Sequence, residues 1–141
     1  MPALALIAEA AFAPYVVRIG QKPAPMVADF AAYVAEGVAY VAEASGAAAG
    51  YIATFEKDTS QFIENVAVHP SHHGEGIGRS LLYFAEQEAG DNGLARLYIC
   101  TNVHMIENLD FYTRLGYVET HRVSEDGFDR VYFEKRIMDE R

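Results

Sequence analysis

The sequence predicts a mixed α/β fold, with one central sheet of mixed strand direction flanked by helices in a single domain, 1–141. Three observations lead to this expectation. A chain of 141 residues, 51% of them hydrophobic, has the size of one domain with one packed core. Short β-prone runs separated by turn residues predict strands. A strand followed by a glycine-rich loop and an apolar helix predicts a crossover to a parallel strand.

The expected elements follow the order ααβββαβαββ, with no internal repeat or linker. They are two helices at 3–13 and 26–36, three strands at 38–44, 48–56 and 62–68, a helix at 79–89, a strand at 94–101, a helix at 106–115, and two strands at 117–123 and 128–136.

Apolar spacing supports the first two helices. The first is rich in Ala and Leu, which favour helix, and places Leu4, Ile7 and Ala8 on one face. The second repeats apolar residues at i, i+4, i+7 and i+8 from Met26, and Gly37 is expected to close it. The segment between them holds three prolines, so we expect a connection there.

Turn residues separate the later elements. Ser45-Gly46 predicts that the first two strands form an antiparallel hairpin. The third and fourth strands should be parallel, because a helix that ends at Asn92-Gly93 crosses between them, and the crossover should be right-handed. Residues 124–127 are expected to join the last two strands as another antiparallel hairpin.

Charge and cysteine content exclude several classes of function. Eleven Lys and Arg residues against 20 Asp and Glu give a net charge of -9, which argues against a nucleic-acid partner and favours a cationic substrate. The one cysteine, Cys100, cannot form an internal disulfide and suits a reducing compartment. No apolar run is long enough to span a membrane, and the apolar start lacks the basic residues of a signal peptide. We therefore expect a cytoplasmic protein without a membrane partner.

The segment between the third strand and the next helix carries the strongest functional signal, with glycines at positions 74, 76 and 78. Glycine permits positive φ, so backbone N–H groups can approach an anion at the positive end of the helix. Arg79 in the first helical turn opposes the helix dipole unless an anion lies there. The Gly-Lys-Ser/Thr ending of a P-loop and the spacing of a dinucleotide loop are both absent. The loop predicts a phosphate site, and the alternative is an ordinary flexible turn.

This loop resembles the pyrophosphate loop of the GNAT acetyltransferase family, which reads Gln or Arg, two residues, Gly, one residue, then Gly or Ala. The matching segment is His73-Gly-Glu-Gly-Ile-Gly78. The resemblance extends to Val66-Ala-Val-His-Pro70 and to Asn108-Leu-Asp-Phe-Tyr-Thr-Arg-Leu-Gly-Tyr117, where the family has an aromatic Tyr followed by Leu-Gly-Phe or Leu-Gly-Tyr. It implies the GNAT fold and acetyl-CoA as cosubstrate. Members usually have a strand before the first helix, and here that first strand is expected to be absent.

The resemblance also assigns residues to the acetyl-CoA site. Strand backbone at Val66 and Val68 would pair with the pantetheine arm where two strands splay apart, and the loop would surround the pyrophosphate. His73 stands where the family has Gln or Arg, and a histidine is only partly charged near pH 7. If His73 contacts phosphate, CoA affinity should weaken as the pH rises from about 6 to about 8. The implied residues are Val66, Ala67, Val68, His73, Gly74, Gly76, Ile77, Gly78, Arg79, Ser80 and Asn108.

Acyl transfer to an amine needs a base, an oxyanion stabiliser and a proton for the departing thiolate. Glu64 is the candidate base, because it lies four residues before Val68 and is expected on the same strand face; a surface carboxylate is the alternative. Tyr112 is the acid that the resemblance implies, with core packing as the alternative. The amide of Ala67 or Val68 is expected to stabilise the oxyanion.

Two classes of function remain open from the sequence. One is an N-acetyltransferase acting on a primary amine of a small molecule or peptide, and the other is an inactive acyl-CoA-binding sensor or interaction module. Thr101 and Asn102 are candidate substrate-binding residues, although such residues commonly cap the next turn instead. The histidines lack the paired spacing of a zinc site, so no metal is expected. A homodimer is consistent with the aromatic C-terminal hairpin and a bare sheet edge.

Overall fold

A computed structural model describes residues 2–137, without the side chain of Pro2. Its elements are α1 (Pro2–Ile19), a 3-10 helix η1 (Ala24–Val27), α2 (Phe30–Glu36), β1 (Ala39–Ala44), β2 (Ala47–Lys57), β3 (Ser60–Val68), a 3-10 helix η2 (Pro70–His72), α3 (Ile77–Asp91), β4 (Arg96–Asn102), α4 (Ile106–Arg114), β5 (Val118–Glu125) and β6 (Phe128–Arg136). The expected mixed α/β fold is confirmed, and the two 3-10 helices are additions to it.

One sheet runs through the described chain in the order β1-β2-β3-β4-β6-β5. The pair β3 and β4 is parallel, as expected from the intervening helix, and the other neighbouring strands are antiparallel. Ser45 and Gly46 both have positive φ, as a two-residue hairpin turn requires. The last hairpin turns at Asp126 and Gly127 in the same way, so β5 is longer and its turn shorter than expected.

The helical boundaries near the N-terminus differ from the expectation. Helix α1 continues through Pro14 to Ile19, because Tyr15 and Ile19 pack against the buried cluster that α1 forms with β2 and β3. That packing outweighs the backbone hydrogen bond that a proline removes. The second helix is divided: Asp29 starts α2 by accepting a hydrogen bond from Ala32 N, so the turn around Met26 is a separate 3-10 helix.

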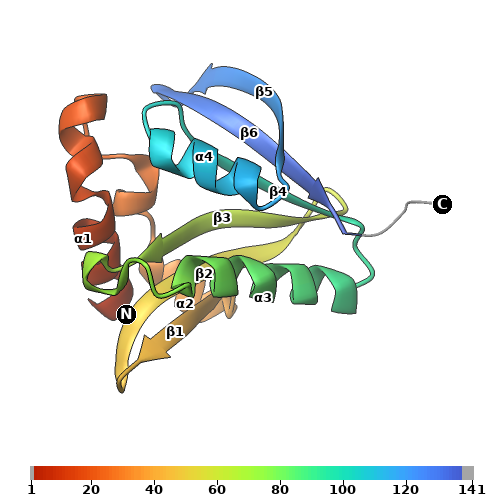
Figure 1. Ribbon diagram of the computed structural model, residues 1–141, viewed down its shortest axis with the longest axis horizontal. Helices are drawn as coiled ribbons and strands as arrows, with labels where there is room; N and C mark the ends of the chain where they lie inside the picture. The colour runs from red at the N-terminus through yellow and green to blue at the C-terminus, as the bar shows by residue number, and fades with distance from the viewer. Residues whose placement is uncertain (1, 138–141) are drawn as a thin grey trace.

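Two apolar clusters cover the two faces of the sheet. Helices α3 and α4 pack on one face, over buried residues such as Ile63, Ile99 and Phe133. Helix α1 packs on the other face, against Tyr51 and Ala67. Figure 1 shows the strands diverging toward α1, with α4 lying beside β6. Among residues 2–137, no helix combines the length and apolarity that a membrane crossing needs.

Candidate functional site

The parallel strands β3 and β4 separate partway along their length. Their pairing ends at Ile63 and Ile99, although both strands continue beyond these residues. The separation opens a pocket of about 610 Å³ that reaches from α4 to α2 and the β5–β6 turn. In the sheet, β4 is the neighbour of β3 on that side. Where β4 has separated, the backbone of β3 has no strand partner on that side and is available to a bound molecule.

The orientation of the β3 backbone distinguishes between the two candidate oxyanion donors. His69 N donates to Ala49 O of β2 at 2.8 Å. Because hydrogen-bonding direction alternates along an antiparallel strand, the N–H of Ala67 also faces β2, whereas those of Val66 and Val68 face the separation. The Ala67 side chain is buried against α1. Val68 is therefore the better placed donor of the two, and Ala67 presents neither its N–H nor its side chain to the separation.

Glu64 lies at an irregularity in β3. Ala53 of β2 pairs with Asn65 and the next residue, Thr54, pairs with Ile63, so Glu64 is the extra residue of a β-bulge. The expectation that Glu64 shares a face with Val68 assumed unbroken alternation, and the bulge breaks it. Glu64 instead lines the pocket beside Tyr33 of α2. Burial, and then a hydrogen bond to the Glu64 carboxylate, raise the pKa of Tyr33.

Tyr112 lies on α4 and lines the same pocket, with 4% of its surface exposed. Its ring packs against Phe111, Tyr117 and Phe133 at centroid distances of 5.8 to 5.9 Å. Tyr112 therefore packs in the core, as its alternative role predicted, and also lines the pocket. Burial raises the pKa of the Tyr112 hydroxyl, which therefore keeps its proton through neutral pH.

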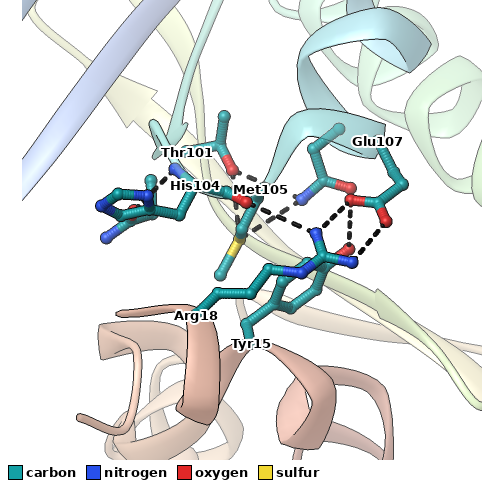
Figure 2. A network of polar contacts seen from close by, with 8 residues as sticks. Tyr15, Arg18, Thr101, His104, Met105 and Glu107 are labelled. Carbon is teal, nitrogen blue, oxygen red and sulfur yellow. Dashed lines mark hydrogen bonds and ion pairs between the residues drawn. The ribbon is translucent and has the colours of Figure 1, made fainter. Parts of the chain in front are cut away.

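Polar residues at the end of β4 connect to the start of α4 (Figure 2). Asn108 Nδ2 donates to Thr101 Oγ1 at 3.3 Å, and Thr101 Oγ1 lies 3.3 Å from Met105 Sδ. Asn102 Oδ1 accepts from His104 N at 2.9 Å, which is the turn-capping role considered for it. Thr101, Asn102 and Asn108 nevertheless all line the pocket. The structure therefore brings these three residues together with Glu64, Val66 and Tyr112.

The glycine loop ends at the N-terminus of α3, outside the pocket lining. Gly74 and Gly76 have φ of 84° and 80°, conformations that other residues rarely adopt. Gly76, the N-cap residue, provides no side-chain cap. The hydrogen bonds of the helix begin at Ser80, whose N–H donates to Gly76 O. The N–H groups of the first three helical residues, 77–79, thus lack an intrahelical acceptor.

The surroundings of this helix end suit an anion. The first turn of α3 contains no acidic residue. Glu75, the negative charge in the loop, is paired with His72 at 3.1 Å rather than with the helix end. His73 and Arg79 are exposed beside it. At Gly78 the nearest side chains are Phe111 and Val68, so the loop lies next to the separated strands.

Sequence reasoning missed several pocket residues. Asn65, 3% exposed, accepts a hydrogen bond from the Tyr51 hydroxyl at 3.0 Å and donates to Pro25 O at 3.1 Å. A polar residue within an apolar strand was a usable signal for it. Tyr33 and Cys100 also line the pocket, and nothing in their local sequence marks them. Burial raises the pKa of the Cys100 thiol. Within residues 2–137, no three His, Cys, Asp or Glu side chains come together as metal ligands.

Comparison with known proteins gives a consistent result. The model of the Acetyltransferase (GNAT) family matches residues 4–117. The ribosomal-protein-S18-alanine N-acetyltransferase from Escherichia coli is 20% identical with a TM-score of 0.76, and the match covers 99% of this chain and 88% of that one. A GNAT family acetyltransferase from Elizabethkingia anophelis with acetyl-CoA bound is 19% identical with a TM-score of 0.64, over 80% of this chain and 88% of that one.

A nourseothricin acetyltransferase is 22% identical with a TM-score of 0.65, over 70% of this chain and 64% of that one. The present chain therefore spans less than two thirds of the length of that enzyme. At such identities the likeness to these three structures concerns the fold.

Proposed function

The chain belongs to the GNAT acetyltransferase family, because the model of that family matches residues 4–117, and we propose that the protein transfers an acetyl group from acetyl-CoA to a primary amine of a small molecule or peptide. The observation that carries this proposal is the pocket at the separated strands, which joins Glu64 of β3 to Tyr112 of α4. A base and an acid facing one cavity meet the needs of acyl transfer to an amine.

The features of the chain fit acetyl-CoA. The pyrophosphate of acetyl-CoA would lie at the uncapped start of α3. The loop and first-turn residues around it would be His73, Gly74, Gly76, Ile77, Gly78, Arg79 and Ser80. Val66 and Val68 would hold the pantetheine arm through backbone groups that have no strand partner. When bound, acetyl-CoA supplies an activated thioester carbonyl.

Three groups of the chain then have defined roles. The Glu64 carboxylate takes a proton from the amine, directly or through water, since an alkyl amine is almost entirely protonated at neutral pH. The Val68 N–H stabilises the oxyanion. The Tyr112 hydroxyl, which carries its proton at neutral pH, gives that proton to the departing thiolate.

Thiol release from acetyl-CoA in the presence of a panel of primary amines tests the proposal, with acetyl-CoA binding measured by calorimetry on the same sample. Amine-dependent release supports the enzyme and begins to identify its acceptor. Tight binding without release for any amine would instead support the acyl-CoA sensor. Absence of binding would contradict the role given to the glycine loop.

We also propose that the activity is cytoplasmic, because Cys100 has no cysteine partner in the chain and suits a reducing compartment. The homodimer expected from the sequence stays a prediction, which the mass of the protein in solution tests.

A further inference from the structure

A row of aromatic rings crosses the sheet on the face opposite α3 and α4. Phe62 of β3 lies 6.4 Å from Tyr98 of β4, Tyr98 lies 5.5 Å from Tyr132 of β6, and Tyr132 stacks on His121 of β5 at 4.6 Å, all measured between ring centroids. Their neighbours along β4 and β6, such as Leu97 and Phe133, point into the core on the other face. The four rings are therefore a continuous surface that belongs to four strands.

This surface lines a groove of about 600 Å³. The groove adjoins the pocket of the proposed active site, because Lys57, Phe62, Glu125 and Tyr132 line both. On this face of the sheet, α1 makes its main strand contacts with β2 and β3, and η1 with β3. The rings thus stay half-buried or exposed, directly beside the reaction pocket.

Four of the charged side chains along the groove, those of Lys57, Arg96, Glu125 and Glu134, have partners within the chain. Arg96 Nη1 lies 3.0 Å from Glu134 Oε1, and Arg130 Nη1 lies 3.2 Å from Glu125 Oε1. Glu125 also accepts a hydrogen bond from the Tyr132 hydroxyl. The Lys57 ammonium lies over the Phe62 ring, 5.0 Å from its centroid. A flat uncharged group fits such a surface better than a second ion, because it stacks on the rings without separating these pairs.

The distance between groove and reaction centre limits the length of an acceptor. Cys100 lines the reaction pocket, and Tyr98 lies two residues earlier on the same face of β4, which corresponds to about 7 Å along a strand. An amine at the level of Cys100 would reach a ring over Tyr98 through a linker of about two or three carbon atoms.

We propose that the aromatic groove is the acceptor subsite and binds the aromatic ring of a primary amine whose nitrogen enters the reaction pocket. This inference rests on the proposed function and narrows its substrate class to amines that carry an aromatic group on a short linker. Tyr98 is then a specificity-determining residue, because its ring lies in the row between those of Phe62 and Tyr132 and contacts both.

The test compares kcat/KM for 2-phenylethylamine and butylamine in the wild type, in Tyr98→Leu and in Tyr83→Leu. Tyr83 is an exposed tyrosine on α3 and serves as the matched control. The wild type should prefer 2-phenylethylamine by about tenfold, as expected for one favourable ring contact. Tyr98→Leu should lose that preference, whereas Tyr83→Leu should keep both the preference and the wild-type rates. Equal use of both amines by the wild type, or an unchanged preference in Tyr98→Leu, would overturn the inference.

A binding measurement keeps this inference separate from the proposed function. Titration of 2-phenylethylamine into the CoA-bound wild type, followed by NMR, should shift the backbone signals of Tyr98 and Tyr132 more than butylamine does. Such shifts, with no turnover of any amine in the panel, would reject the acetyltransferase and retain the subsite. Turnover without such shifts would retain the acetyltransferase and reject the subsite. A dimer in solution that Tyr98→Leu converts to a monomer would assign the face to a second copy and also overturn the inference.

Discussion

The Arg18 guanidinium binds both carboxylate oxygens of Glu107, with Nη1–Oε1 at 2.8 Å and Nη2–Oε2 at 2.9 Å (Figure 2). The pair joins the last turn of α1 to the first turn of α4, the helix that carries Tyr112. Tyr15 contributes to the same junction, with its hydroxyl 3.5 Å from Glu107 Oε1. The junction therefore holds α4 to the other half of the molecule at the end where β3 and β4 have separated.

This junction should make stability depend on pH in the acid range. The hydrogen bonds from Arg18 are the main cause that lowers the pKa of Glu107, from 4.5 to about 2. The stabilisation is then fully present above pH 4.5 and is lost as the pH falls through about 2. The effect should be small and sensitive to salt, because both side chains are exposed. Urea unfolding should show Arg18→Leu to be less stable than the wild type at neutral pH and to approach it below about pH 2. A difference in stability that persists below about pH 2 would show that the ion pair does not cause it.

Gly50 should tolerate no larger residue, because β2 and α3 are packed closely at this point. An added Cβ would lie 2.8 Å from Ala67 O and 3.1 Å from Ile77 Cγ2, and backbone atoms cannot move aside easily. Gly50→Ala should lower the free energy of unfolding by about 1–3 kcal/mol. Gly90→Ala is the control, since a Cβ there meets nothing within 4 Å, and helix propensity should make it neutral or stabilising. Equal stability of the two variants would contradict the packing described here.

Replacing Glu64 tests the proposed base. Glu64→Gln should lower kcat by about a hundredfold, the lower end for loss of general base catalysis, while acetyl-CoA affinity stays within about twofold. Glu56→Gln, at an exposed carboxylate on the neighbouring strand β2, should leave both quantities unchanged. Steady-state kinetics give kcat and calorimetry gives acetyl-CoA affinity for both variants and the wild type. Full turnover in Glu64→Gln would return Glu64 to the role of a surface carboxylate.

Tyr112→Phe removes the proposed acid and keeps the aromatic packing. We expect kcat to fall by about a hundredfold, with little change in the thermal midpoint. Tyr117 provides the control, because its hydroxyl is buried without a hydrogen-bond partner within residues 2–137 and does not line the pocket. Tyr117→Phe should therefore retain activity and be at least as stable. If Tyr112→Phe also retains its activity, the hydroxyl is dispensable and Tyr112 serves packing alone.

The sequence alone was sufficient to predict the order of the elements, the parallel pair β3 and β4, and the loop before α3. These follow from local chemistry: apolar spacing, turn residues such as Ser45-Gly46, and glycines that permit positive φ. It also placed Tyr112 on a helix, and the match to the family over 4–117 confirms the resemblance drawn from these motifs.

Tertiary structure decided what depends on partners distant in the chain. Helix α1 passes through Pro14 because Tyr15 and Ile19 find apolar contacts that a local rule does not include. The bulge that turns Glu64 toward Tyr33 exists only in the pairing of β2 with β3, and the aromatic row exists only where four strands lie side by side. Spacing along a chain determines helices, turns and loops, whereas which side chains meet in a pocket depends on strand register and packing, which are settled when the whole fold forms.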